Sequence, residues 1–588
     1  GKMIRISSLS PMQSFSVVVT TALLLRLTQG AATTETTGTT ETDVRPSIVF
    51  ILADDLGYNE MGFMNSSRGI HTPHLDTLAK EGVILKNYYV QPICSPTRSA
   101  FMTGRVPLHL GTQSNVIFWD TPWAIDVSET FLPQNLQDAG YDTAMFGKWH
   151  LGMFRRSAWP RSRGFDEHMG YLQGCQSKGT HTAACCAPGN ATSGDLHYTC
   201  TPRGHKDFRG YDWFKSAGGQ SLPDTSANGT SSAELIGNAA VEYIWRKAFS
   251  SQKPFFLYLP FQNIHDPYSV EPRFREIYSH VSGITDEEVT MWGYISEMDE
   301  QVGRVVDALK DSGMYNKTII FFSSDNGAPP ALGVSHEEQL VPGLTPAWSR
   351  RNFPFRGYKT TLWEGGTRVP GFVHSPLLPA KVQGTVSEAL LHITDWLPTI
   401  VGLAGGNTKR NRALDGFNVW PTILGGPNPR QEVLYNVNPL CHTGQAGAPK
   451  AGIRVGDWKL LTWCYSIRGI DGANVTGPTG SSPGEFQNGV ALFDLATDPR
   501  ETSNVAAWHP KVVKALLARL AQWAEKSVEP MQWTAPYQGK DYFCKDCPLH
   551  PSRHHDPSIP WTDWIKDNTT DFVDGFGETF PDHMSVVV

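Results

Sequence analysis

The sequence predicts an α/β fold, in which strands and helices alternate along the chain. Short apolar runs recur, and stretches with helical periodicity separate them. Polar clusters follow directly after several of the apolar runs. Because ligands in open α/β sheets bind beyond the carboxyl ends of the strands, we expect these polar clusters to converge on one site.

The first strand is predicted at Ser47 to Ala53, a continuous apolar run that suits a sheet covered on both faces. It ends at Asp54-Asp55. A helix is expected to begin at Thr72-Pro73 and to stop at Gly82. In the next segment, Ser-Pro marks another helix start, which places Cys94 just before a helix N-terminus.

Three later strands also end in polar residues. They are predicted at Tyr141 to Phe146, Phe255 to Leu259 and Thr318 to Phe322. The polar segments that follow them are Gly147-Lys148-Trp149-His150, Gln262-Asn263-Ile264-His265-Asp266 and Ser324-Asp325-Asn326-Gly327. Apolar residues at helical spacing predict a long helix from about Asp286 to Asp311.

Length and composition exclude some classes of protein. With 588 residues, 40% of them hydrophobic and 18% charged, the chain can bury a large core and is expected to form two domains. A nucleic-acid binder would carry a basic surface, whereas the net charge here is −7. No nucleic-acid partner is therefore expected.

The N-terminal region has the pattern of a signal peptide, assigned to residues 1–30. Lys2 and Arg5 precede an apolar run from about Phe15 to Leu25 and then small residues around Gly30. A Thr-rich linker is expected at 31–45. The signal peptide predicts that the chain enters the secretory pathway and becomes lysosomal or secreted. No later run reaches the about 18 apolar residues of a membrane span, so no span is expected in the mature chain.

The cysteine count agrees with that compartment. Apart from Cys94 the chain has an even number that could pair fully as disulfides: Cys175, Cys185, Cys186, Cys200, Cys441, Cys464, Cys544 and Cys547. A zinc site at Cys544 and Cys547 with His550, His554 and His555 is the alternative, but its spacing is irregular. Possible glycan acceptors are Asn65, Asn190, Asn228, Asn316, Asn474 and Asn568.

The acidic clusters predict a metal site. Asp54 and Asp55 at one strand end, with Asp325 and Asn326 at another, offer only oxygen ligands, which suits a hard cation such as Ca²⁺. A single Asp-Asp pair is usually a solvated turn or a helix cap. The second cluster at an equivalent strand end favours the metal.

The basic residues form a second predicted group. Lys148, His150, His265 and Lys359 all follow predicted strands or lie in loops. Each alone reads as a surface lysine or a satisfied histidine. Together they would supply the cations and the proton donor that a reaction with developing negative charge requires. Cys94 at a helix N-terminus would face the same anion, unless it is an ordinary buried or disulfide-bonded cysteine.

The segment from Cys94 through Arg98 to Arg105 resembles the sulfatase signature. Other segments look like the sulfatase family in order and spacing, over roughly residues 46 to 530, with the strongest likeness to the arylsulfatase B type. These segments are 51–57, 139–152, 163–166, 325–327, 356–370, 453–460 and 492–499. There is no cysteine between Cys94 and Cys175, so the disulfide connectivity of that type does not carry over.

The resemblance implies a fold and a set of roles. The fold is a large domain like alkaline phosphatase, with a mixed, mostly parallel sheet between helices, and a smaller domain with an antiparallel sheet and one helix. We place these at 46–428 and 429–588, tail included, with the helix near His509 to Lys526. By motif match, the Ca²⁺ ligands would be Asp54, Asp55, Asp325, Asn326 and the modified residue 94.

In the resembling family, the cysteine is oxidised to formylglycine, which implies a formylglycine-generating enzyme as a partner of Cys94. Its hydrate would attack sulfur, and its second hydroxyl would then allow sulfate to be expelled. Arg98 would hold the hydrate, and Lys148 and Lys359 would bind sulfate oxygens. His150 would be the base that drives sulfate elimination, and His265, helped by Lys359, the acid for the departing alcohol.

The resemblance suggests a sulfated carbohydrate, such as N-acetylgalactosamine sulfate of a glycosaminoglycan, or an aryl sulfate as the substrate. Two alternatives stay open at this point. One is a formylglycine-dependent phosphonate or phosphate ester hydrolase, since the same groups would serve phosphoryl transfer. The other is a catalytically silent protein that binds sulfated glycans and keeps Cys94 as a thiol.

Overall fold

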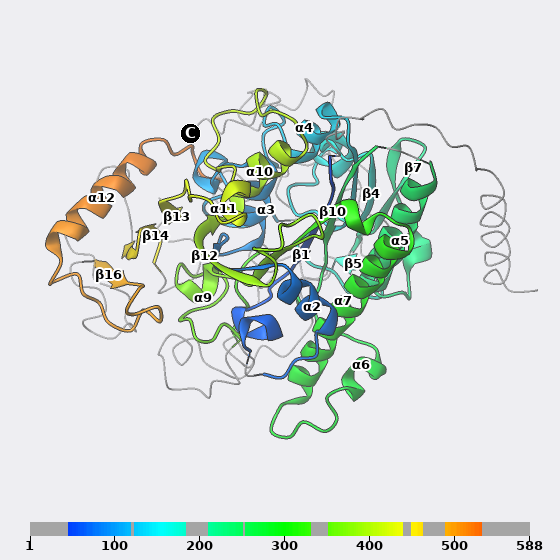
Figure 1. Ribbon diagram of the computed structural model, residues 1–588, viewed down its shortest axis with the longest axis horizontal. Coiled ribbons are helices and arrows are strands. Elements are labelled where there is room, and N and C mark those ends of the chain that lie inside the picture. The colour runs from blue at the N-terminus through cyan, green and yellow to red at the C-terminus, as the bar shows by residue number, and fades with distance from the viewer. Residues whose placement is uncertain are drawn as a thin grey trace, which may run out of the picture. The chain divides into compact units, whose positions relative to one another are not determined.

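A mixed sheet of ten strands forms the centre of the structure (Figure 1). In this computed structural model the described residues are 45–66, 68–118, 123–183, 210–250, 253–330, 351–438, 449–462 and 489–531. In spatial order the strands are β12 (Thr385–His392), β2 (Val83–Tyr89), β11 (Gly371–His374), β10 (Thr318–Ser324), β1 (Ser47–Ala53), β9 (Phe255–Pro260), β3 (Asp142–Lys148), β4 (Glu167–Tyr171), β7 (Phe214–Ala217) and β8 (Gln220–Pro223).

The middle of this sheet is parallel. The strand β1 lies between β10 and β9, and β3 and β4 continue in the same direction. Ala53 pairs with Ser324, and Leu52 pairs with Pro260, so three strands end at one edge of the sheet. The register of β1 with its two neighbours therefore brings the polar segments together at the carboxyl ends of the strands, as predicted.

Helices cover both faces of the sheet, as a continuous apolar strand requires. On one face Ile48, Phe50 and Leu52 share a core with α3 (Cys94–Thr103), α4 (Leu132–Asp138) and α10 (Trp396–Leu403). On the other face, the alternate residues Val49 and Ile51 share a core with α2 (Pro73–Glu81), α5 (Ser232–Ser250) and α7 (Asp286–Asp311).

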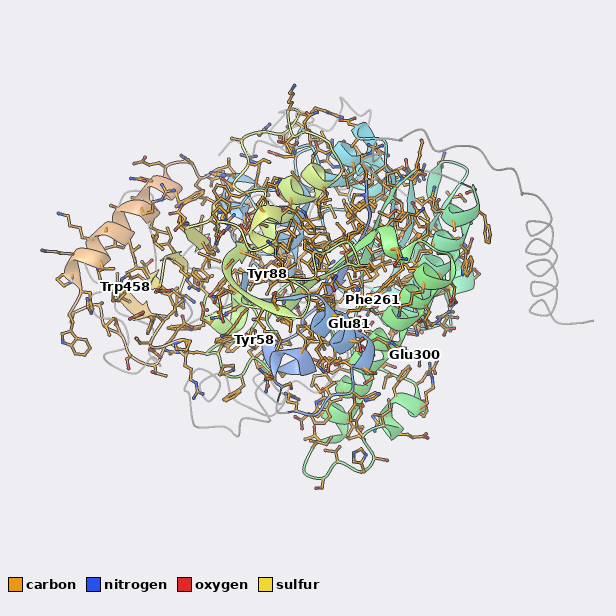
Figure 2. All side chains as sticks on the ribbon, in the orientation of Figure 1. Tyr58, Glu81, Tyr88, Phe261, Glu300 and Trp458 are labelled. Atoms are coloured by element: carbon orange, nitrogen blue, oxygen red, sulfur yellow. The ribbon has the colours of Figure 1, made fainter. Side chains whose placement is uncertain are left out.

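Side chains from other parts of the chain complete the two cores. Tyr88 belongs to the core that contains α3, and Phe261 belongs to the core that contains α7; both are fully buried (Figure 2). Shorter helices are α6 (Pro272–Glu276), α9 (Glu364–Thr367) and α11 (Trp420–Ile423). The two large apolar layers hold the carboxyl edge of the sheet in place.

Most predicted elements are confirmed, and several boundaries are corrected. The strands β9 and β10 run on to Pro260 and Ser324, beyond their predicted ends at Leu259 and Phe322. The helix α3 begins at Cys94 itself, with Ile93 as its N-cap, and not after it. The strand predicted to end at Phe146 runs on to Lys148, because pairing with β4 continues through Gly147 and Gly170. The long helix spans Asp286–Asp311 as predicted, and a capping box between Thr285 and Glu288 fixes its start.

A second, antiparallel sheet follows in the sequence. Its strands are β13 (Glu432–Val437), β14 (Ala451–Val455), β15 (Trp458–Thr462) and β16 (Val490–Asp494). The helix α12 (Pro510–Ala524) packs on it through Leu516 and Leu520. A small sheet of β5 (Thr182–Ala183) and β6 (Gly210–Tyr211) completes the strands. The predicted smaller sheet with one helix is confirmed, while the boundary at residues 428 and 429 stays a prediction.

Several predictions fall outside the described residues. These are the signal peptide, the Thr-rich linker, the alternative zinc site, and every cysteine except Cys94 and Cys175. Cys94 is a free thiol, and Cys175 forms a disulfide. Of the possible glycan acceptors, Asn65, Asn228 and Asn316 are described, and all three are exposed. Within the described segments, none of the helices has both the length and the apolar character to cross a membrane.

Candidate active site

Four oxygen-bearing side chains meet where β1 and β10 end. The Asp325 N–H donates to the Ala53 carbonyl at 3.0 Å, and the Asp55 N–H donates to Asp325 Oδ1 at 3.2 Å. Asn326 Nδ2 donates to Asp55 Oδ1 at 2.7 Å. Asp54, Asp55, Asp325 and Asn326 are each at most 1% exposed. The predicted acidic cluster is therefore a buried constellation and not a solvated turn.

The loop after β9 adds His265 to this group. The Asp54 N–H donates to the Asn263 carbonyl at 2.8 Å, and the Ile264 N–H donates to the Asp54 carbonyl at 2.6 Å. These bonds tie the loop to the end of β1. His265 Nε2 then lies 3.7 Å from Asp55 Oδ2, while its Nδ1 lies 2.7 Å from the Asp266 carbonyl. The carbonyl accepts a hydrogen bond from the Nδ1–H and thereby orients the ring.

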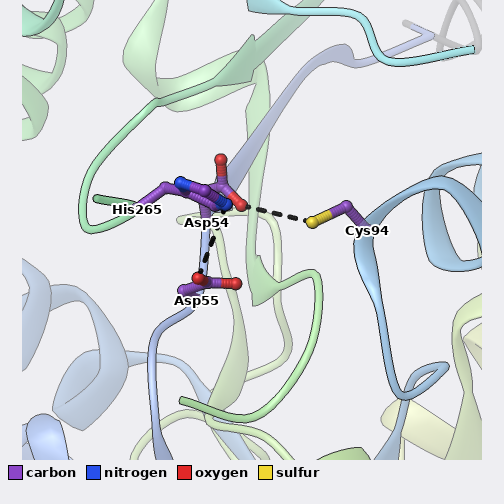
Figure 3. A group of neighbouring side chains, drawn as sticks. All are labelled: Asp54, Asp55, Cys94 and His265. Carbon is purple, nitrogen blue, oxygen red and sulfur yellow. Dashed lines mark hydrogen bonds and ion pairs between the residues drawn. The ribbon is translucent and has the colours of Figure 1, made fainter. Parts of the chain in front are cut away.

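Cys94 faces the acidic cluster from the first position of α3. Its Sγ lies 3.7 Å from Asp54 Oδ1, and the residue is 2% exposed (Figure 3). Asp54, Asp55, Cys94 and His265 each offer a possible ligand atom, and these atoms lie within 4.8 Å of one another. Burial, with Asp325 nearby, raises the pKa of the Cys94 thiol to about 12. At neutral pH the thiol is therefore protonated.

Three buried cations pair with the three carboxylates. Arg98 donates from Nη2 to Asp325 Oδ2 at 2.8 Å, Lys148 Nζ donates to Asp54 Oδ2 at 2.6 Å, and Lys359 Nζ donates to Asp55 Oδ2 at 2.8 Å. Arg98 Nη1 also donates to the Lys148 carbonyl at 3.1 Å. These pairs offset the cost of burying so many charges in one place.

The pairing sets the ionisation of the carboxylates. Burial opposes the charge on Asp55, but Lys359 and His265 outweigh it and hold its pKa at about 2. Burial likewise opposes the charge on Asp325, and Arg98 outweighs it, so its pKa is lowered. Asp54 differs, because burial raises its pKa to about 6 although Lys148 acts against this.

His150 lies in a strained position two residues after β3. Its φ is 58°, its N–H donates to the Leu172 carbonyl at 3.1 Å, and its carbonyl accepts a hydrogen bond from Ser95 Oγ at 2.9 Å. Burial and then Lys148 lower the pKa of His150 well below its usual value. Its Nδ1 is buried without a hydrogen-bond partner. The ring is therefore neutral, with a nitrogen able to accept a proton.

The site fits a hard cation. Asn326 Oδ1 is buried and has no hydrogen-bond partner, although Nδ2 of the same amide is paired. An unpaired buried amide oxygen is costly unless something binds it. Beside it stand the carboxylates of Asp54, Asp55 and Asp325, so the donors are oxygens, the type that Ca²⁺ prefers.

A buried ion network joins α9, which follows the Lys359 loop in the sequence, to the antiparallel sheet. Lys459 Nζ on β15 lies 2.9 Å from Glu364 Oε1 on α9 and 2.7 Å from Glu501 Oε1. Glu501 Oε2 accepts the Glu364 N–H at 2.7 Å, and Tyr435 donates to Glu364 Oε1 at 2.8 Å. The antiparallel sheet therefore anchors the segment that carries Lys359.

The structure brings together every residue that the sequence placed in the site, while their individual roles stay predictions. Sequence reasoning missed Ser95, Asn263 and Lys459. Ser95 lies inside the Cys94 motif, which could have drawn attention to it. Asn263 lies in the polar segment after β9 and Lys459 in the resembling segment 453–460, but Asn263 acts through its main chain and Lys459 through partners far away in the sequence, so the local pattern did not reveal their roles.

Comparisons with known proteins decide the family. The sequence profile of the Sulfatase family matches residues 46–406. The chain belongs to the sulfatase family. The predicted resemblance and the predicted enzyme class, a sulfuric ester hydrolase of the arylsulfatase type, are confirmed. The matched segment includes Cys94 and the carboxylates, cations and histidines around it, whereas Lys459 and Glu501 of the supporting ion network lie beyond it.

Individual relatives agree with this assignment. Arylsulfatase J of Mus musculus is 36% identical, over 82% of this chain and 76% of its own length. N-acetylgalactosamine-6-sulfatase of Homo sapiens is 29% identical, over 83% of this chain and 87% of its own length. The crystal structure of Ps i-CgsB in complex with k-i-k-neocarrahexaose has a TM-score of 0.63 at 25% identity, covering 83% of this chain and 94% of that one. The predicted fold class is confirmed.

Proposed function

We propose that this sulfatase hydrolyses sulfate monoesters on sulfated glycans, with formylglycine made from Cys94 as its nucleophile and Ca²⁺ as its metal. The observation that carries the proposal is the position of Cys94. It stands at the N-terminus of α3, beside three buried carboxylates and three buried cations. A helix N-terminus and cations both favour a bound anion.

The protonation state of Cys94 supports a modified residue. A cysteine acts as a nucleophile through its thiolate, which reactive enzymes stabilise by a lowered pKa. Here the pKa is raised to about 12 by burial. The thiol is therefore a poor nucleophile as it stands, whereas it is well placed as the precursor of an oxygen nucleophile.

The side chains of the chain divide the remaining work. Lys148 and Lys359 neutralise the sulfate group and stabilise the charge that develops on its oxygens, and Arg98 holds the formylglycine hydrate. Asp54, Asp55, Asp325 and Asn326 would hold Ca²⁺, which when bound polarises the sulfate ester, while formylglycine supplies the attacking oxygen.

Proton transfer falls to the two histidines. His150 is neutral and accepts the proton that accompanies sulfate release. Burial and Lys359 disfavour the protonated form of His265, but Asp55, Asp54 and Asp266 outweigh them and raise its pKa. His265 is thus able to carry the proton that the departing alcohol needs.

The substrate class rests on the relatives. One acts as an N-acetylgalactosamine-6-sulfatase, and a solved structure holds a neocarrahexaose. We infer that the substrate is a sulfated carbohydrate, such as N-acetylgalactosamine sulfate of a glycosaminoglycan, and that aryl sulfates also serve. The protein would mature in the secretory pathway, where a formylglycine-generating enzyme acts on Cys94, and would be lysosomal or secreted.

A paired assay tests the proposal. The protein made in a secretory host is given 4-nitrophenyl sulfate and 4-nitrophenyl phosphate side by side, with Cys94→Ala as the matched variant. We expect turnover of the sulfate ester and its loss in Cys94→Ala. A preference for the phosphate would support the phosphoester alternative. Unchanged turnover in Cys94→Ala would remove Cys94 from the mechanism, and no turnover with intact glycan binding would favour the binding protein.

A further inference from the structure

The segment after β4 contacts both the main chain and the ring of His150. The Trp149 N–H donates to the Tyr171 carbonyl at 2.9 Å, and the His150 N–H donates to the Leu172 carbonyl at 3.1 Å. A Cβ placed on Gly174 would lie 2.7 Å from Cε1 and 2.8 Å from Nε2 of His150. The imidazole therefore packs directly against the Gly174 backbone, with no room for a side chain.

Asp212 holds this segment through hydrogen bonds to its backbone. The Leu172 N–H donates to Asp212 Oδ1 and the Gln173 N–H donates to Asp212 Oδ2, both at 2.9 Å. The Asp212 N–H donates to the His181 carbonyl at 2.8 Å, which fixes the aspartate itself. One carboxylate thus clamps the two residues that lie directly before Gly174.

Burying the Asp212 carboxyl group costs the protein folding stability. Asp212 is fully buried, and within the described segments no ion pair joins it to a cation. Burial raises the pKa of Asp212 to about 7, although the two backbone hydrogen bonds act against this. Burying a carboxyl group without a counter-ion costs stability, and hydrogen bonds to the group offset only part of that cost. The position of Asp212 therefore suggests that it holds the segment for a functional reason.

We propose that Asp212 and Gly174 are positioning residues for His150. Asp212 holds the segment 172–174 in place. The Gly174 backbone in this segment packs against the His150 imidazole and so sets the orientation of the ring that acts as the base. The inference rests on the proposed function, in which His150 accepts the proton during sulfate release. Both residues act through His150, and neither takes a chemical step itself.

The proposal predicts a change in kcat without an equal change in kcat/KM, which a general loss of folded enzyme would not produce. His150 serves the half-reaction that releases sulfate, after the alcohol has left. A misplaced His150 therefore slows kcat, while kcat/KM, which reports the steps up to alcohol release, is maintained. A misplacement of about 1 Å can lower a rate by about 100-fold. We expect Asp212→Asn and Gly174→Ala each to lower kcat by about 10- to 100-fold.

The experiment is stopped-flow and steady-state kinetics with 4-nitrophenyl sulfate on the full chain. In both variants we expect a burst of alcohol product equal to the enzyme concentration, then slow turnover, with kcat/KM within about threefold of wild type. Asp224→Asn is the matched control. It removes a carboxylate that also accepts a backbone N–H, that of Ser226 at 3.2 Å, but that does not reach the His150 segment.

The outcomes separate this inference from the proposed function. His150→Ala is the reference variant, in which we expect a burst, a low kcat and a maintained kcat/KM. If His150→Ala behaves in this way but Asp212→Asn and Gly174→Ala do not, the inference is overturned while the proposed function stands. Equal losses of kcat and kcat/KM in both variants would also overturn it. If Asp212→Asn does not fold, Gly174→Ala decides by the same criteria. Absence of sulfate turnover in the wild type would instead overturn the proposed function.

Discussion

Replacing Lys459 with methionine should strongly destabilise the protein. Lys459 is fully buried and is the cation between Glu364 and Glu501, at 2.9 Å and 2.7 Å. Methionine keeps a similar length and removes the charge. The variant leaves two buried carboxyl groups next to each other without their shared cation.

The magnitude follows from the burial of all three groups. Removing one partner of a buried ion pair typically lowers the free energy of unfolding by about 3–5 kcal/mol. Glu501 already has a pKa raised to about 7 by burial, with Lys459 acting against this. Without Lys459 the pKa of Glu501 rises further, and Glu364 loses the strongest of the cations that hold its pKa at about 2. Stability from a raised pKa is lost as pH rises, so the destabilisation is larger at pH 8 than at pH 5.

Urea unfolding followed by intrinsic tryptophan fluorescence at pH 5 and pH 8 measures this effect. Lys514→Met is the matched control, because Lys514 lies exposed on α12. We expect the control to stay within about 0.5 kcal/mol of wild type. A Lys459→Met variant as stable as the control at both pH values would refute the reasoning that the network anchors the Lys359 segment.

Three further results are expected. Asp299 accepts hydrogen bonds from His74 N–H and Leu75 N–H at the start of α2, and burial raises its pKa from 3.8 to about 7. The free energy of unfolding should therefore fall as pH rises from about 4 to about 7, by at most about 1.4 kcal/mol per pH unit, and urea unfolding should show Asp299→Asn without this slope. Gly147→Ala would place a Cβ 2.0 Å from the Pro260 carbonyl at a φ of +133°, so it should lower the free energy of unfolding by about 2 kcal/mol or more. Dialysis against a calcium chelator should abolish sulfate ester turnover, and added Ca²⁺ should restore it.

Each of these results has a control in the same chain. Asp307→Asn changes an exposed carboxylate on the same helix as Asp299 and should leave the pH slope of wild type; equal slopes in all three proteins would contradict the pKa argument. Gly218→Ala changes a glycine of positive φ with nothing within 4 Å, and an equal loss there would show that the contact with Pro260 is unimportant. Full turnover after exhaustive chelation would exclude the metal.

Much of the active-site edge was predictable from local sequence. A continuous apolar run such as Ser47 to Ala53 indicates a buried strand, and parallel strands bring their carboxyl ends together. The polar residues after such runs, including Asp54 and Asp325, therefore had to meet. The helix Asp286–Asp311 was equally clear, because its apolar spacing and capping residues agree.

The remaining features depend on contacts that no local pattern encodes. Lys459 sits in a short strand where a lysine would be expected at the surface, and only Glu364 and Glu501, distant in sequence, explain its burial. Asp212 acts on backbone N–H groups and matches no motif. His150 has a positive φ, and its main chain hydrogen-bonds to Leu172 and Ser95, which only tertiary packing brings near.

Peptide mass spectrometry across Cys94 to Arg98 tests the central claim most directly. The protein is made in a secretory host that modifies other sulfatases, and the peptide is compared with the same peptide from Cys94→Ala. The proposed function predicts the mass of an aldehyde at position 94. An unmodified thiol at this position, in a host shown to be competent, would contradict it and favour a protein that binds sulfated glycans without hydrolysing them.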